Sequence, residues 1–184
     1  MSLLTPANQL TIARVVLIPF FVILVVYGHL GWALVVFLVA GLTDLFDGLL
    51  ARTISRRTEL GAWLDPVADK LLLVTTFVVL TWPGLGLVNR LPVWLTILVI
   101  SRDVLIVLTV AVINLAVGRR EFRPSIYGKI ATATYIVTCV TIMYFNYLHR
   151  PSVLVQVGIY ASAAINVISA IHYVFSIRLE PKHG

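Results

Sequence analysis

Long apolar runs constrain the fold of this chain more than any other feature of its sequence. Hydrophobic residues make up 60% of its 184 residues and charged residues 12%, and the mean hydropathy is +1.00. Soluble globular domains are nearer ~45–50% apolar, so the composition excludes an ordinary soluble protein. A membrane-spanning helix takes roughly 20 apolar residues, which leaves room for about six such helices.

Short polar or Gly- and Pro-rich links separate the apolar runs, as at Gly28–Gly31 and Pro83–Pro92. We therefore expect an all-α integral membrane protein in which residues 1–184 form a single domain of six transmembrane helices. Thr5-Pro6 opens the first helix, because Pro is favoured at the first helical position. The expected spans are Val15–Tyr27, Trp32–Leu50, Pro66–Trp82, Val93–Val117, Ser125–Tyr147 and Val153–Ile177.

Basic residues are distributed unevenly between the two sides of this predicted bundle. One side carries Arg52, Arg56, Arg57, Arg119, Arg120, Arg123, Arg178 and Lys182, and the opposite side carries only Arg90 and Arg150. Basic links stay in the cytoplasm, so both termini are expected there. The same links favour anionic lipid head groups, and we expect no nucleic-acid partner. Residues 1–9 lack the basic start of a cleavable targeting segment, which favours a bacterial cytoplasmic membrane.

An acidic cluster stands out against this apolar background. It contains four of the chain's eight acidic residues, namely Asp44, Asp47, Asp65 and Asp69. Carboxylates in membrane segments are costly and usually mark functional sites. The first pair is spaced i, i+3 and the second i, i+4, so each pair lies on one face of its helix. Small residues at Gly48 and Ala51 leave the first face open to a ligand or a neighbouring helix.

The link between the two acidic pairs is short enough to make their helices antiparallel neighbours. Asp65-Pro66 has the sequence of a helix start, with Asp as the N-cap and Pro at the first helical position. All four carboxylates can then converge near the cytoplasmic interface. Such a set of oxygen ligands suits Mg²⁺ or Mn²⁺ better than zinc, which usually recruits His or Cys.

Residues 44–69 also carry a family resemblance. They follow the pattern D-x2-D-G-x2-A-R-x8-G-x3-D-x3-D with all eight fixed positions present. This resembles the CDP-alcohol phosphatidyltransferase family, and the six predicted spans extend the resemblance over nearly the whole chain. The resemblance implies an enzyme that transfers a phosphatidyl group from CDP-diacylglycerol to an alcohol, with release of CMP, in a homodimer.

The family pattern assigns roles to the matching residues. It implies that two divalent cations, Mg²⁺ or Mn²⁺, bind the diphosphate through Asp44, Asp47, Asp65 and Asp69. It implies that Asp69 also deprotonates the acceptor hydroxyl. The nucleotide pocket would then comprise Asp44, Asp47, Gly48, Ala51, Arg52 and Gly61.

Two acceptors fit the resemblance, phosphatidylglycerol for cardiolipin synthases and glycerol 3-phosphate for phosphatidylglycerophosphate synthases. Three segments resemble the cardiolipin branch: residues 40–44, 100–104 and 123–129. Val110 and Ala131 stand where the other branch typically has Arg and Lys, so only Arg102 and Lys129 remain of its basic set. A phosphate monoester carries close to two charges, so this loss favours the singly charged phosphatidylglycerol. We expect Arg102 and Lys129 to bind the acceptor.

Alternatives remain open for these residues and for the protein. Arg102 and Asp103 can instead form an interhelical salt bridge, and Lys129 can extend its ammonium to the membrane interface. A membrane prenyltransferase also uses Asp-rich motifs and Mg²⁺, although such motifs normally come twice in a longer chain. A divalent-cation carrier usually shows inverted repeats or broken helices at mid-membrane, whereas this sequence shows no repeat and its aspartates gather at one interface.

Overall fold

The computed structural model describes the chain over residues 6–53, 59–117 and 126–179. Side chains are described for residues 12–43, 70–109, 112, 115 and 126–173. Within the described ranges the chain forms six α-helices and a short 3₁₀ helix, and no strand, which confirms the all-α prediction. The helices are α1 (Pro6–Val26), α2 (Leu30–Thr53), α3 (Glu59–Thr81), α4 (Val93–Val117), α5 (Ile126–Tyr147) and α6 (Val153–Leu179), with η1 (Pro83–Leu85) after α3.

The helices divide into two compact units. The first comprises Met1–Arg90 with Ile142–Pro151, and the second comprises Leu91–Thr141 with Ser152–Gly184. The helix α5 therefore contributes its first part to the second unit and its last part to the first unit. That the whole chain is a single domain stays a prediction.

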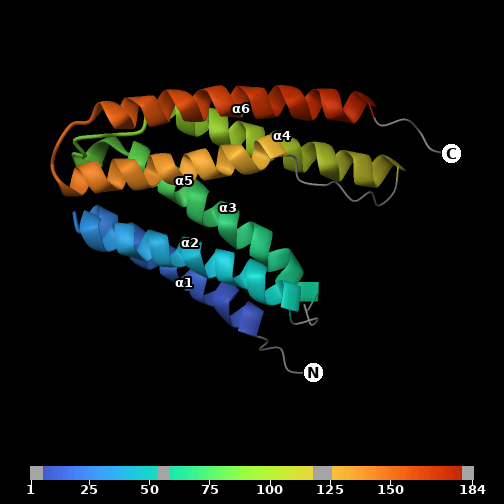
Figure 1. The fold of residues 1–184 in the computed structure, drawn as a ribbon, viewed down its shortest axis with the longest axis horizontal. Coiled ribbons are helices and arrows are strands. Elements are labelled where there is room, and N and C mark those ends of the chain that lie inside the picture. Colours follow the sequence, from blue (N-terminus) through green and yellow to red (C-terminus); the bar gives the residue numbers. More distant parts are fainter. Residues whose placement is uncertain (1–5, 54–58, 118–125, 180–184) are drawn as a thin grey trace. The chain divides into compact units, whose positions relative to one another are not determined.

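In the first unit, α1 packs against α2 and also against α3. The first two helices lie side by side and antiparallel (Figure 1). A tight turn joins them, and Gly28 takes φ +76° there, which a residue without Cβ adopts at little cost. Phe21 and Phe37 are both buried and their ring centroids are 6.0 Å apart, so aromatic packing fixes α1 against α2.

The start of the third helix differs from the prediction. We expected Asp65 as the N-cap and Pro66 at the first helical position, but α3 begins at Glu59 and both residues lie inside it. A proline removes one helical hydrogen bond, yet membrane helices accommodate it because neighbouring groups satisfy the freed carbonyl. Pro19 lies inside α1 in the same way. The sequence rule for Pro at helix starts was therefore wrong here.

In the first unit, a pair of asparagines joins the link after α3 to the link after α5. Asn146 in α5 accepts a hydrogen bond of 2.8 Å from the Asn89 backbone N–H and donates one of 2.7 Å to the Asn89 carbonyl. The Asn89 side chain in turn donates to the Arg150 carbonyl at 2.7 Å. Both asparagines are buried. These bonds hold the link after α3 against the link after α5.

In the second unit, α4 packs against α6, and α5 approaches α6 closely. Thr138 Oγ1 lies 3.2 Å from the Gly158 carbonyl and 3.0 Å from Ser162 Oγ. A Cβ on Gly158 would lie only 3.0 Å from Thr138 Oγ1, so the two backbones can approach this closely because residue 158 is glycine.

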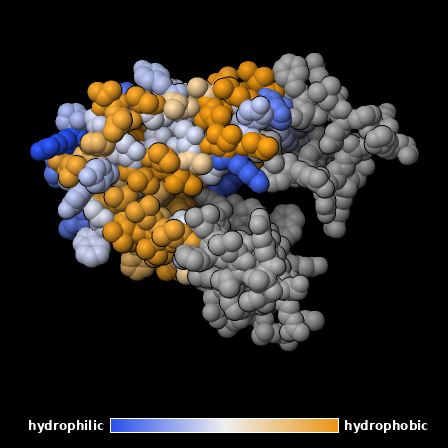
Figure 2. All heavy atoms as spheres, in the orientation of Figure 1, coloured by the Kyte–Doolittle hydropathy of each residue, from blue (hydrophilic) through white to orange (hydrophobic). Residues whose placement is uncertain are grey.

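Apolar side chains are widespread on the surface of the described helices. Figure 2 shows them in orange over much of the described surface on the side viewed, and exposed examples include Phe20, Leu105 and Val137. Among the described residues, Ile126–Tyr147 and Val153–Tyr173 are long and apolar enough to cross a membrane. An exposed apolar surface of this kind suits contact with lipid.

Candidate active site

The acidic motif is carried by two continuous helices. The backbone of α2 includes Asp44 and Asp47, and that of α3 includes Asp65 and Asp69, whereas their side chains lie outside the described part of the structure. The same holds for the predicted nucleotide-binding residues Gly48, Ala51, Arg52 and Gly61. Because both helices are continuous through the motif, the i, i+3 and i, i+4 registers expected from sequence apply.

Because α3 begins at Glu59, the motif residue Gly61 lies in the same helix as Asp65 and Asp69. Gly61, Asp65 and Asp69 are each four positions apart within α3, so they occupy one helical face. The two motif helices are joined across residues 54–58, which keeps the end of α2 near the start of α3. The geometry therefore concentrates the motif at one end of this helix pair.

The motif residues fit a divalent cation by their chemistry. Four carboxylates form an all-oxygen donor set, which Mg²⁺ and Mn²⁺ prefer. Among the side chains that the structure describes, no three His, Cys, Asp or Glu residues come together. By their chemistry the four aspartates are the donor set to test, and their convergence on cations stays a prediction.

Arg14 is a residue that sequence reasoning undervalued. Its side chain is only 1% exposed, on a helix that packs against both motif helices. Because α1 and α2 are antiparallel, residues equally far from the turn between them lie at the same level. Arg14 and Leu42 are equally far from that turn, so the backbone of Arg14 is nearly level with Asp44. A buried guanidinium in a membrane helix is costly unless anionic or polar groups surround it. The sequence signal for Arg14 is a charge close to an apolar run, which is also typical of the polar start of a membrane helix.

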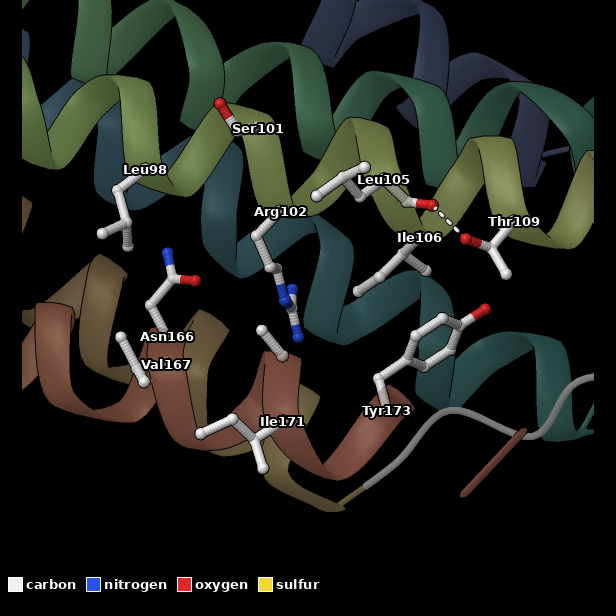
Figure 3. Close-up of a pocket in the computed structure, with 11 residues that line it drawn as sticks. Leu98, Ser101, Arg102, Leu105, Ile106, Thr109, Asn166, Val167, Ile171 and Tyr173 are labelled. Carbon is white, nitrogen blue, oxygen red and sulfur yellow. Dashed lines mark hydrogen bonds between the residues drawn. The ribbon is translucent and has the colours of Figure 1, made fainter. Parts of the chain in front are cut away.

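A pocket of about 580 Å³ lies between α4 and α6 in the second unit. Most of its wall is apolar, and Figure 3 shows the side chains of the two helices facing each other across it. The lining residues are Leu98, Ser101, Arg102, Leu105, Ile106, Thr109, Asn166, Val167, Ala170, Ile171 and Tyr173. The pocket thus includes Arg102, which was predicted to bind the acceptor.

Arg102 extends from α4 toward α6 and is 8% exposed. Its Nη1 forms a 2.8 Å ion pair with Asp103, its neighbour in α4, and its Nη2 donates to Ser169 Oγ in α6. The printed ion pair thus lies within α4, and the bond of Arg102 to α6 is made to a hydroxyl. An interhelical salt bridge through this pair stays a prediction. The charge of Arg102 is largely balanced where it faces the pocket.

Three polar atoms at this pocket are buried without a hydrogen-bond partner in the described part of the chain. They are Arg102 Nε, Asn166 Nδ2 and Tyr173 OH. A buried donor left unsatisfied costs about 1–3 kcal/mol, so three at one pocket indicate that a ligand or water completes them. Sequence reasoning missed Asn166, Ser169 and Tyr173, because each is a single polar residue within the apolar run of α6.

Lys129 lies in the first turn of α5 and is exposed. It does not line the α4–α6 pocket. Its predicted role at the acceptor and its alternative role at the membrane interface both stay predictions.

Comparison with known proteins adds to this geometry. Residues 4–175 match the CDP-alcohol phosphatidyltransferase family, a stretch that includes most of both units. The chain is 34% identical to the "Probable phosphatidylglycerophosphate synthase" of Mycobacterium tuberculosis, over 91% of this chain and 79% of that protein.

Two further relatives carry names for different reactions. The chain is 33% identical to the "CDP-diacylglycerol--glycerol-3-phosphate 3-phosphatidyltransferase" of Shigella flexneri, over 93% of each chain. It is also 34% identical to the "Cardiolipin synthase (CMP-forming)" of Streptomyces coelicolor, over 70% of this chain and 60% of that protein. By name, these relatives divide between phosphatidylglycerophosphate synthesis and cardiolipin synthesis.

Proposed function

Because the chain belongs to the CDP-alcohol phosphatidyltransferase family, and is therefore a membrane transferase of phospholipid synthesis that uses CDP-diacylglycerol, we propose that its acceptor is phosphatidylglycerol. The product is then cardiolipin, and CMP is released. Family membership makes the protein an enzyme, which sets aside the cation carrier among the alternatives. We also propose six membrane spans, both termini and the acidic motif on the cytoplasmic side of a bacterial membrane, and a homodimer.

The proposed chemistry uses the residues of the motif. The acceptor hydroxyl oxygen attacks the phosphorus of the phosphatidyl group, its proton passes to Asp69, and the bond from that phosphorus to the CMP oxygen breaks. Asp69 must lie within hydrogen-bond reach of the hydroxyl to accept the proton. The four aspartates Asp44, Asp47, Asp65 and Asp69 would hold two divalent cations, which when bound neutralise the diphosphate charge.

The remaining motif residues have a role in binding the donor. Gly48, Ala51 and Gly61 leave space for the cytidine nucleotide beside the two helices, and Arg52 adds a positive charge at the end of α2. This assignment rests on the family pattern together with the continuity of both helices.

The Arg102–Asp103 ion pair supports phosphatidylglycerol as the acceptor. Arg102 is the charged residue among those that line this mostly apolar pocket, and Asp103 already balances much of its charge at 2.8 Å. A phosphate monoester, whose own charge is about −2, would meet little net positive charge in this pocket. It would also lose much of its hydration. A phosphodiester with one charge and an attached lipid suits this environment better.

Glycerol 3-phosphate is the second candidate acceptor. The names of the Mycobacterium and Shigella relatives favour it, and these relatives align over more of the chain than the Streptomyces cardiolipin synthase does. Against it, Val110 and Ala131 stand where a second and a third cation would be expected. The names of relatives therefore do not decide the acceptor.

An acceptor panel tests the proposal. Purified protein in detergent receives CDP-diacylglycerol, Mg²⁺ or Mn²⁺, and either phosphatidylglycerol or glycerol 3-phosphate, and both CMP and the lipid product are measured. We expect cardiolipin from phosphatidylglycerol. Phosphatidylglycerophosphate formed from glycerol 3-phosphate alone would overturn the acceptor while leaving the family chemistry intact. Reactions without acceptor measure hydrolysis of the donor.

A further inference from the structure

The α4–α6 pocket has the dimensions of a site for a lipid chain. Its wall follows α4 from Leu98 to Thr109, a distance of roughly 16 Å at the helical rise per residue. Leu105, Val167 and Ile171 line it and are also substantially exposed. The pocket is thus an elongated apolar slot that opens at the surface of the second unit.

Polar donors are placed within this slot. Figure 3 shows the Arg102 guanidinium and the Asn166 amide between the two helices, and the Tyr173 side chain extending from α6. Arg102 and Asn166 are 8% and 1% exposed. Arg102 Nε, Asn166 Nδ2 and Tyr173 OH lack a hydrogen-bond partner among the described residues. A fitting ligand must therefore supply acceptor oxygens as well as apolar surface.

We propose that this slot binds the acyl chain and the ester region of the lipid acceptor, with Asn166 and Tyr173 as specificity-determining residues. The ester carbonyl and phosphodiester oxygens of phosphatidylglycerol accept hydrogen bonds and donate none through those atoms, which matches three unused donors. The balanced charge of Arg102 suits one negative charge. Glycerol 3-phosphate has no group that would cover the apolar walls. This inference rests on the proposed function, because it says where the proposed lipid acceptor binds.

Filling the slot tests the inference directly. Ala170 lines the pocket, so Ala170→Trp places an indole where the acyl chain is proposed to lie. Ala161 is exposed on the same helix and does not line the pocket, so Ala161→Trp is the matched control. Native mass spectrometry of the full-length protein in detergent then follows binding of phosphatidylglycerol, CDP-diacylglycerol and phosphatidylcholine without any turnover.

We expect Ala170→Trp to weaken phosphatidylglycerol binding by about tenfold or more and Ala161→Trp to leave it unchanged. Asn166→Leu and Tyr173→Phe should each weaken it by about three- to tenfold, as single hydrogen bonds do. Neither polar variant should change CDP-diacylglycerol binding. A photoreactive phosphatidylglycerol with the label on its acyl chain should attach to α4 or α6 in the wild type and lose that attachment in Ala170→Trp.

Three results would overturn the inference. Unchanged phosphatidylglycerol binding by Ala170→Trp would show that the slot does not hold this lipid. A selective loss of CDP-diacylglycerol binding would assign the slot to the donor lipid. A changed oligomeric state with unchanged lipid binding would assign it to a second copy of the chain. By contrast, phosphatidylglycerol that binds in the slot but yields no cardiolipin would refute the proposed function alone.

Discussion

The two motif helices and the α4–α6 pocket represent opposite ways of building a site. The motif places four carboxylates at fixed spacing on α2 and α3, within one short stretch of sequence. At the pocket, Arg102 of α4 binds its neighbour Asp103 and also Ser169 of α6, 67 residues away. The comparison teaches that a family motif can be encoded locally, whereas the proposed acceptor site consists of residues brought together by folding.

The largest effect is expected at the motif. Asp69→Asn removes the proposed base and one carboxylate of the donor set, and we expect CMP release to fall about 1000-fold, within the range of general base catalysis. CMP release from CDP-diacylglycerol measures the effect, and excess EDTA should abolish the wild-type reaction. Glu59→Gln, at the first residue of the same helix, is the matched control. A turnover within tenfold of wild type would remove Asp69 from the mechanism.

A substitution at the asparagine pair should lower the stability of the first unit without changing turnover. Asn146→Leu removes both hydrogen bonds to the Asn89 backbone, and we expect a loss of roughly 2–4 kcal/mol in the free energy of unfolding. Thermal unfolding in detergent should show a lower midpoint, with turnover near normal well below it. Arg150→Ala is the control, because residue 150 accepts through its backbone carbonyl. An unchanged midpoint would contradict the role given to this pair.

The ion pair at the pocket gives a test of acceptor choice. Asp103→Asn leaves the Arg102 charge less balanced, so the more highly charged acceptor should become more favourable. We expect the ratio of kcat/KM for glycerol 3-phosphate to that for phosphatidylglycerol to rise by about tenfold, equivalent to 1.4 kcal/mol. Ser101→Ala, at a pocket residue without charge, controls for altered packing. A fall in both values by the same factor would show that the pair does not select the acceptor.

The smallest effect is expected at Lys129, which is exposed. Exposed charges contribute little, and we expect Lys129→Ala to raise the KM for the acceptor by about threefold. The KM for CDP-diacylglycerol should not change. Steady-state kinetics with each substrate varied in turn make the comparison, and Lys70→Ala, at an exposed lysine of α3, is the control. Equal changes for both substrates would place Lys129 outside the acceptor site.

The helices were largely predictable from the sequence, because apolar runs and polar links mark where membrane helices begin and end. The fourth helix has the predicted bounds, Val93–Val117, where Pro92 precedes it. The start of α3 was not predictable by the same rules, since Pro66 satisfies the pattern of a helix start and also fits inside a membrane helix. Local sequence does not distinguish these two cases.

The candidate site was predictable only in part. Their spacing in an apolar chain and the family motif single out the four aspartates, and the resemblance to one branch of the family points to Arg102. Asn166, Ser169 and Tyr173 carry no such signal, because a single polar residue in a membrane helix is common. Their relation to Arg102 depends on how α4 packs against α6, which is a property of the folded chain.

The asparagine pair also has a consequence for how the protein is made. Asn89 leaves the ribosome long before Asn146, and the bonds between them join residues 57 positions apart. The link after α3 therefore gains these two bonds only once α5 has been synthesised. A chain truncated before α5 lacks both bonds, so the fifth helix completes the first unit as well as part of the second.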